Sequence, residues 1–244
     1  WRFYHHQSAF LSHEEEVHFH QDRSGKKIYD PTYKSCTKFL ATIASEKFGF
    51  DSRDVEELIH WADIVDGAQF PDAKTAVELG APAMKLTLVI EASPENVTGR
   101  MIEWMRRRRL EEIAALPEIQ ALFEPLYRRH LESIELIRRL ARCDRRVVVF
   151  DLGADRHEGY NKFIPYYLFP ESVYTVSVST SSFRTKVSVG SNPWAAEAPR
   201  HNLATICERY GGGGHPRVGA ISFEPGEIER ARAVAAEIAE QLRS

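Results

Sequence analysis

Residues 211–217 read GGGGHPR, and this stretch decides how the second half of the chain is interpreted. Four consecutive glycines lose much conformational entropy on folding, and a simple turn or helix end needs only one. A glycine loop that ends in His215 suits a backbone whose N–H groups closely approach an anion. The helical pattern before it presents the negative end of its dipole, so phosphate affinity would come from loop amides, His215 and nearby arginines. A flexible structural turn is the alternative.

The sequence around this stretch alternates between strand and helix patterns. The predicted strands are residues 146–152, 172–178, 185–191 and 217–223. The predicted helices are residues 201–210 and 227–242. This alternation predicts an α/β domain of roughly 100 residues in the second half of the chain.

The first half of the chain is mostly helical in pattern. Residues 36–48 and 53–65 carry apolar side chains at helical spacing, with Ser35 and Ser52 as N-caps. Further predictions are a helix at 74–92, a polar break at 93–99, and a strand end, loop and short helix within 1–30. A charged helical pattern from 99 to 142 predicts a connector, in which Pro117 opens a second helix.

Composition excludes several classes of protein. The chain has 244 residues, 43% hydrophobic and 11% aromatic, which is enough to build a core and excludes intrinsic disorder. Three cysteines exclude a disulfide scaffold and favour a reduced, cytoplasmic setting. The sequence contains no run of about 20 apolar residues, so it predicts no membrane span. A net charge of −3 argues against a dedicated duplex-DNA binder, but it leaves a small phosphorylated substrate open.

Two pairs of polar residues in the first half are candidate ligands. At a strand end His5 and His6 could serve a metal and a substrate, although two solvated or core histidines, or a tag remnant, are the alternative. Asp63 and Asp66 are three residues apart at a predicted helix end, so both could lie on one face. A solvated helix end is the alternative for this pair.

Together, YHHQSAF at 4–10, WADIVDGAQF at 61–70 and GGGGH at 211–215 resemble the DHH phosphoesterase superfamily, in the branch that carries a DHHA1 domain. The resemblance covers nearly the whole chain. It implies an α/β fold with part of a DHH-type catalytic domain at 1–98, a helical connector at 99–145 and a DHHA1-type substrate-binding domain at 146–244. Substrate would bind in the cleft, and the family often forms homodimers.

The resemblance also implies residue roles and cofactors. Two Mn²⁺ or Mg²⁺ ions would activate a water that attacks phosphorus, as in two-metal clamps. His5 and Asp66 would hold a metal, and His6 would contact the scissile phosphate. Residues expected to bind substrate are Arg184, Lys186, Ser188, Gly211, Gly212, Gly213, Gly214, His215 and Arg217. Of these, Arg184 is chosen because a guanidinium can bind phosphate with two hydrogen bonds.

The sequence departs from the family pattern in two ways. Tyr4 stands where the family has aspartate, and a phenol is a poorer acceptor for orienting a metal-bound histidine. The family's earlier His-x-Asp-x-Asp segment and a further Asp have no counterpart here, so the chain begins at the third motif. Three explanations remain open: a preceding portion of the protein, a completing partner chain, or a reduced non-catalytic form.

These observations support two functions. The first is a metal-dependent phosphoesterase that cleaves phosphodiesters or phosphomonoesters of small nucleotides or short oligonucleotides. The second is a catalytically degenerate relative that binds a nucleotide or nucleic acid. A lesser possibility is nucleic-acid binding by residues 106–109, four arginines that a continuous helix would spread around its circumference. Tyr166, Tyr167 and Phe169 could stack on a base, but half-buried strand aromatics are commoner.

Overall fold

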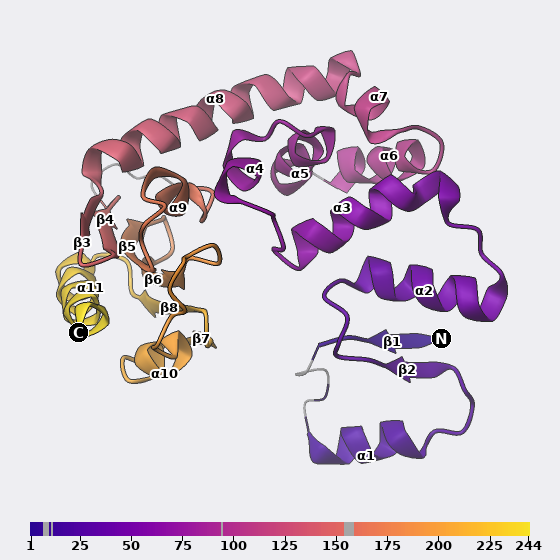
Figure 1. The fold of residues 1–244 in the computed structure, drawn as a ribbon, viewed down its shortest axis with the longest axis horizontal. Helices are drawn as coiled ribbons and strands as arrows, with labels where there is room; N and C mark the ends of the chain where they lie inside the picture. The colour runs from indigo at the N-terminus through magenta and orange to yellow at the C-terminus, as the bar shows by residue number, and fades with distance from the viewer. Residues whose placement is uncertain (7–9, 11, 94, 154–158) are drawn as a thin grey trace. The chain divides into compact units, whose positions relative to one another are not determined.

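The computed structural model describes residues 1–6, 10, 12–93, 95–153 and 159–244, with the side chains of 95 and 96 left out. The chain forms two compact units (Figure 1). Unit 1 comprises residues 1–71 and 80–123, and unit 2 comprises residues 72–79 and 124–244. Both contain helices and β-structure, which confirms the predicted α/β class.

Unit 1 begins with a small parallel sheet. Strand β1 (Arg2–Tyr4) pairs with β2 (Lys27–Tyr29), and α1 (His13–Gln21) lies between them in the chain. Helix α2 (Cys36–Phe48) contacts both β1 and α3 (Glu56–Asp66), and its Phe39 is fully buried. The remaining helices of this unit are α5 (Pro82–Ala92), α6 (Glu95–Met105), α7 (Leu110–Ala114) and the start of α8 (Pro117–Leu140).

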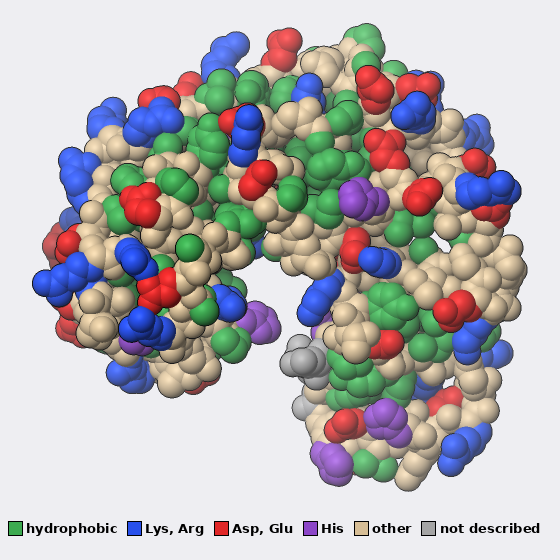
Figure 2. Space-filling model, in the orientation of Figure 1, with side chains coloured by type: hydrophobic (Ala, Val, Ile, Leu, Met, Phe, Trp, Pro, Cys, Tyr) green, Lys and Arg blue, Asp and Glu red, His purple; other side chains and the backbone are tan. Residues whose placement is uncertain are grey.

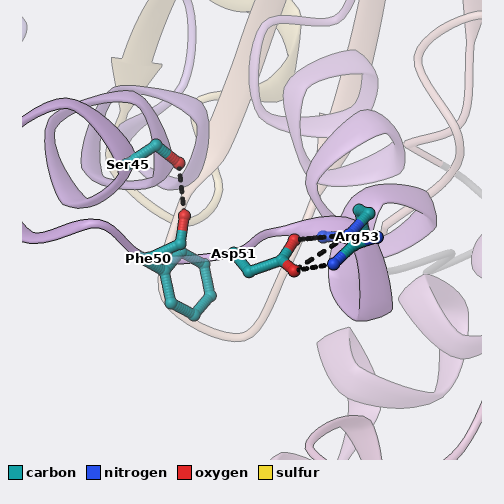
Figure 3. Close-up of polar contacts among 4 residues, drawn as sticks. All are labelled: Ser45, Phe50, Asp51 and Arg53. Carbon is teal, nitrogen blue, oxygen red and sulfur yellow. Dashed lines mark hydrogen bonds and ion pairs between the residues drawn. The ribbon is translucent and has the colours of Figure 1, made fainter.

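The connection from α2 to α3 is held by local polar contacts (Figure 3). Ser45 Oγ donates to the Phe50 carbonyl at 2.9 Å, and the Asp51 carboxylate accepts from the Arg53 guanidinium. Ser35 caps α2 as predicted, because its Oγ accepts from the Lys38 N–H. The prediction for Ser52 was wrong, since its side chain makes no capping bond; the short 3₁₀ turn η1 (Arg53–Val55) precedes α3 instead.

The helix predicted over 74–92 is broken in two. Helix α4 (Ala73–Glu78) ends at Leu79, which adopts a left-handed conformation with φ of 54°, and α5 starts at Pro82. Leu79 is buried, so the packing of its side chain holds a backbone conformation that leucine disfavours. This break also divides the units, because α4 belongs to unit 2 and α5 to unit 1.

The charged stretch 99–142 contains α6, α7 and α8 rather than two helices, and the predicted break at 93–99 is shorter because α6 starts at Glu95. Pro117 is the first residue of α8, as predicted. Residues 106–109 lie in a turn between α6 and α7, so the expected helix through the four arginines is wrong. The division between the units falls within α8 after Phe123, next to Pro125, which lacks the N–H for a helical hydrogen bond.

Unit 2 is built on a six-stranded sheet of order β3-β4-β5-β6-β8-β7. The strands are β3 (Arg142–Asp144), β4 (Val147–Asp151), β5 (Tyr174–Thr180), β6 (Thr185–Ser191), β7 (Gly213–His215) and β8 (Val218–Phe223). Helices α10 (Leu203–Glu208) and α11 (Ile228–Arg243) pack on one face of the sheet, and Val176, Val187 and Ile221 are central to this core.

Helix α9 (Ile164–Leu168) bonds to the opposite face of the same sheet, since Tyr166 Oη lies 3.0 Å from Thr175 Oγ1 of β5. The aromatic residues of 166–169 were expected on a strand, so that part of the prediction was wrong. Tyr166 is buried, and Tyr167 donates to the Glu78 carboxylate, so both have structural roles. In the described part of the chain, no helix has the length and apolar character needed to cross a membrane.

Candidate functional site

The second face of the unit 2 sheet carries a row of small side chains. Strand register aligns Ser177 of β5, Ser188 of β6, Ala220 of β8 and Gly213 of β7 across four strands. Alternate residues point to the same face. Among the residues of this face that stay at least partly accessible, six are here called the open face: Lys186, Ser188, Gly213, His215, Ala220 and Ser222.

Aromatic side chains limit the open face on its β5 side. Tyr160 Oη lies 2.7 Å from Ser177 Oγ. A Cβ on Gly190 would lie 2.6 Å from the Tyr166 hydroxyl oxygen, so this hydroxyl fills the space beside the glycine. Burial raises the pKa of both tyrosines, so each remains a neutral phenol. These contacts cover Ser177 and Gly190 and leave the β6, β8 and β7 part of the face accessible.

Two cationic side chains border the open face. The Arg184 guanidinium donates to Ser222 Oγ at 3.3 Å, and Lys186 lies opposite Ser222 in the strand register. Burial and the neighbouring Arg184 charge lower the pKa of Lys186 below its usual value. Arg184 also lies over the ring of Phe183, which is 67% exposed at the β5–β6 hairpin. The sequence prediction named Arg184, Lys186 and Ser188 but missed Phe183 and Ser222.

The four glycines meet different structural demands. Gly211 has a left-handed φ of 77°. A Cβ on Gly212 would lie 2.3 Å from the Ala220 carbonyl oxygen, and one on Gly214, whose φ is 153°, would lie 2.2 Å from the Val218 carbonyl oxygen. Gly213 has neither a positive φ nor a neighbour within 4 Å of its missing Cβ. Structural reasons therefore account for three glycines, and Gly213 is the one whose absent side chain leaves open space.

The last three residues of the GGGGH run form an edge strand. Gly213, Gly214 and His215 make up β7, paired antiparallel with β8. His215 is exposed on the same face as Gly213, opposite Val218. Arg217 lies in the turn that follows, and its carbonyl accepts from Ser191 N and Oγ; its side chain is exposed. The structure thus places Arg184, Lys186, Ser188, Gly213 and His215 on or beside one surface.

In unit 1, His5 and His6 follow the carboxyl end of β1. Their rings lie 3.9 Å apart, centroid to centroid. His5 Nε2 is buried and has no hydrogen-bond partner in the described part of the chain, whereas His6 is exposed. The parallel register brings Asp30 to the same edge, where its N–H donates to the Tyr4 carbonyl. Asp30, which directly follows β2, was not singled out from sequence.

The Asp30 carboxylate is oriented toward its own loop. It accepts from Thr32 N at 2.9 Å and Thr32 Oγ1 at 2.6 Å. These hydrogen bonds lower the pKa of Asp30. Residues 7–9 of the YHHQSAF motif lie outside the described residues.

Tyr4 is part of an aromatic cluster. Its ring lies 5.8 Å from Phe10 and 5.2 Å from Phe19, and both of these also contact the Tyr29 ring. Tyr4 is therefore used in apolar packing. A carboxylate at position 4 could orient His5 through a hydrogen bond. The ring contacts of Tyr4 with Phe10 and Phe19 do not supply such a bond.

The two carboxylates at the end of α3 have separate environments. Asp63 accepts from Ser35 Oγ and Lys38 Nζ, each at 2.9 Å, and so ties α3 to the start of α2. Burial raises the pKa of Asp63, but the hydrogen bonds from Lys38 and Ser35 outweigh it and leave the pKa lowered. Asp66 is exposed, and its carboxylate contacts neither histidine in the described part of the chain.

Gly67, which follows Asp66, has a right-handed conformation, and Ala68 takes the left-handed one with φ of 51°. A Cβ on Gly67 would lie 2.9 Å from the Asp63 carbonyl oxygen and 3.0 Å from Lys34 Cβ. Glycine at this position therefore allows close packing at the helix end, and the backbone reversal is made one residue later.

The fit of the donor set to a metal is partial. A buried imidazole nitrogen without a partner, such as His5 Nε2, is the state expected of a ligating histidine. Across residues 1–6, 10, 12–93, 95–153 and 159–244, however, no group of three or more His, Cys, Asp or Glu side chains is placed to hold an ion. The described residues of this chain therefore supply a single clear donor and not a complete site.

The arginine turn, residues 106–109, lies beside a groove of about 660 Å³ in unit 1. Arg53, Arg108 and Arg109 line the groove together with three acidic residues, Asp54, Glu56 and Glu57. The Arg53 guanidinium is already bound to Asp51, which raises the pKa of Arg53 (Figure 3). The mixed charge of this groove makes it a weak anion site.

Comparison with solved structures gives an independent view of the fold. The chain resembles a protein titled pGpG-specific phosphodiesterase, PggH from Vibrio cholerae, with a TM-score of 0.74 and 21% sequence identity. The match covers 91% of this chain and 77% of that chain. The two proteins share a fold. No protein-family model and no curated protein matched the sequence.

Proposed function

We propose that this protein is a metal-dependent phosphoesterase that hydrolyses small nucleotides or short oligonucleotides. The observation that carries the proposal is the open face, where strand register gathers a lysine, two serines, a histidine and an unobstructed glycine backbone. Small hydroxyl side chains and backbone amides suit the many acceptor oxygens of phosphates, and the cations supply charge. The fold shared with a phosphodiesterase supports the same proposal.

The residues of the open face would bind the substrate. Lys186 and Arg184 would neutralise a phosphate, because burial already makes the Lys186 charge costly in the absence of an anion. Gly213 would allow a phosphate close to the strand-edge backbone, with His215 as a further donor. The exposed Phe183 ring, backed by Arg184, would stack on a base.

In unit 1, His5 would hold a divalent metal through its unpartnered Nε2, and Asp66 would be a further ligand. A bound Mn²⁺ or Mg²⁺ ion would supply an activated water and charge neutralisation at phosphorus. His6, exposed next to His5, would contact the scissile phosphate and limit its orientation. Asp63 is excluded from this role because Ser35 and Lys38 already occupy its oxygens.

Hydrolysis assays on the full chain test this proposal. The substrates are the dinucleotide pGpG, other 5′-phosphorylated dinucleotides, a nucleoside bisphosphate and short RNA, each with Mn²⁺, Mg²⁺ or EDTA. We expect metal-dependent release of mononucleotides, with kcat/KM lowered at least roughly tenfold in Lys186→Gln, equal to about 1.4 kcal/mol of transition-state stabilisation. Absence of turnover on every substrate with either metal would contradict the phosphoesterase proposal.

The second candidate is a binding protein without catalysis. Two observations favour it: Tyr4 packs in an aromatic cluster, and the described residues hold no three-donor metal site. A non-catalytic binding protein predicts that a nucleotide raises the melting temperature of the protein in EDTA and that the nucleotide is recovered intact. Loss of that shift in His215→Ala would assign the binding to the open face.

A further inference from the structure

The hairpin between β3 and β4 has an unusual sequence for its geometry. Asp144 pairs with Val147, so only Arg145 and Arg146 form the loop. Their φ values are 45° and 64°, and positive φ at both central residues defines a type I′ turn. Such turns favour Asn-Gly or Asp-Gly because other residues are strained there. Local folding alone would not select two arginines, so a function of their side chains is indicated.

Both arginines line a cavity of about 450 Å³ within unit 2. Arg200, Arg243 and His201 line it as well, and Glu197 is the one carboxylate side chain among the lining residues. Figure 2 shows Lys and Arg side chains, with Asp and Glu side chains between them, on the side of unit 2 where the end of α8, β3 and α11 lie. A volume of this size accommodates a small organic ligand.

The charges in the cavity are unequally matched. Glu197 is shared by two guanidiniums, Arg146 and Arg200, the latter at 2.5 Å. Arg145 is exposed and makes no ion pair within the described part of the chain. Arg243 is paired with Asp144 and Glu240, so the unmatched positive charge belongs to Arg145 and to the two guanidiniums that share Glu197. A phosphate dianion has the charge and the several acceptor oxygens that guanidiniums bind.

The wall of the cavity contains a buried tyrosine, which offers a further donor. Tyr174 is 5% exposed, and its hydroxyl oxygen accepts from Arg200 N at 2.6 Å and His201 N at 3.0 Å. The described residues show no acceptor for the proton of this hydroxyl, so the hydroxyl can donate to an oxygen of a ligand. Val173 and Leu242 add apolar surface beside it, suited to the organic part of a ligand.

We propose that this cavity, the Arg145–Arg146 pocket, binds a small phosphomonoester of mononucleotide size. The phosphate contacts Arg145, Arg146 and Arg200, and the organic part lies against Val173 and Leu242. Tyr174 belongs to the helix-covered face of the sheet, so the pocket lies on the opposite face from Lys186 and His215. The pocket is therefore a second site, independent of the proposed phosphoesterase function.

Isothermal titration calorimetry on the full chain in EDTA tests the pocket, with AMP and GMP as ligands. Inorganic phosphate and adenosine serve as the two partial ligands. The decisive variant is Arg145→Asn with Arg146→Gly, which removes both guanidiniums and installs the sequence that a type I′ turn prefers. We expect this variant to unfold at a higher temperature than the unchanged protein and to bind mononucleotide at least tenfold more weakly.

Two controls separate this site from the rest of the chain. Arg128→Gln with Arg129→Gln removes the same charge from exposed positions on α8 and is expected to leave binding unchanged. Lys186→Gln alters the open face, and the Arg145→Asn, Arg146→Gly change is expected to weaken mononucleotide binding by the same factor in its presence as in its absence. Retention of mononucleotide affinity in the Arg145→Asn, Arg146→Gly variant, within twofold, would overturn the proposal. Inorganic phosphate binding as tightly as AMP would overturn the mononucleotide assignment. Loss in Lys186→Gln alone would overturn the pocket and favour the open face.

Discussion

The open face and the surroundings of His5 show two ways in which a chain places polar residues. On the open face, Ser188, Ala220 and Gly213 come from three strands, β6, β8 and β7, and hydrogen-bonded register aligns them across the sheet. At the end of β1, His5 and His6 are adjacent in sequence, and their rings meet without help from distant elements. Asp66, expected to join them, shows no contact with either in the described residues.

Proximity in a sequence motif and proximity in space therefore have different causes. A sheet repeats its spacing across every strand, so residues of one face must be neighbours. A helix end and a strand end share no regular spacing, so only tertiary packing can bring their residues together. Strand register therefore supports the proposed substrate binding, whereas the proposed metal binding is supported by one buried nitrogen without a hydrogen-bond partner among the described residues, His5 Nε2.

Replacing His5 should produce the largest effect. His5→Ala is expected to lower metal-dependent hydrolysis by more than about 100-fold, since even residues that only orient a metal ligand contribute roughly 10–100-fold. His13→Ala, which removes an exposed imidazole of α1 that lies 3.6 Å from the Glu16 carboxylate, is the matched control and should retain full activity. The measurement is kcat/KM at several Mn²⁺ concentrations. Equal activity in both variants would remove His5 from the proposed metal site.

The glycine run offers a sharper comparison within one motif. Gly212→Ala should lower the free energy of unfolding by about 1–3 kcal/mol, because its Cβ would overlap the β8 backbone. Gly213→Ala has open space and should change stability by less than about 0.5 kcal/mol. It should nevertheless raise KM roughly tenfold, equal to about 1.4 kcal/mol of binding. Urea unfolding and steady-state kinetics measure the two effects, and an unchanged KM in Gly213→Ala would remove that glycine from the binding surface.

Asp63 and Asp66 should differ in stability. Asp63→Ala is expected to lower the free energy of unfolding by about 1–3 kcal/mol, since it leaves Ser35 and Lys38 without their acceptor. Asp66→Ala should leave stability unchanged or raise it by a few tenths of a kcal/mol, because a carboxylate at a helix C-terminus opposes the dipole. Equal losses in both variants, measured by thermal unfolding at pH 7, would contradict the separate roles.

The contribution of Asp63 should also depend on pH. Its pKa is lowered in the folded state from the ordinary value of 3.8. Its stabilisation is therefore fully present above that ordinary value and is lost as the pH falls through the lower folded pKa. The stability difference between the unchanged protein and Asp63→Ala should shrink in this acidic window. A difference that persisted below it would contradict the assigned ion pair.

The smallest effect is expected at the arginine turn. Arg107→Gln with Arg108→Gln should alter the slope of log affinity against log salt for a short RNA by less than about 0.5, since acidic residues line the adjacent groove. Lys186→Gln, as the contrasting variant, should reduce the magnitude of that slope by roughly 0.7, the change for one single-strand phosphate contact. A larger reduction in the arginine variant would reassign strand binding to unit 1.

The sequence by itself determined the elements whose signals are local. Helix α2 and strand β6 have the predicted bounds, Ser35 caps α2, and Pro117 starts α8. Each of these follows from periodicity or from a hydrogen bond within a few residues, so no distant contact was needed. The α/β class followed from the alternation of such elements.

Tertiary structure alone decided which residue of each motif is free to function. Pairing with β8 made part of the glycine run a strand and left Gly213 unobstructed. Contact with α2, across 28 residues, engaged Asp63 and left Asp66 exposed. Packing of buried Leu79 broke a helix that local periodicity predicted to be continuous. In each case the deciding partner is distant in sequence, and short-range patterns carry no information about long-range contacts.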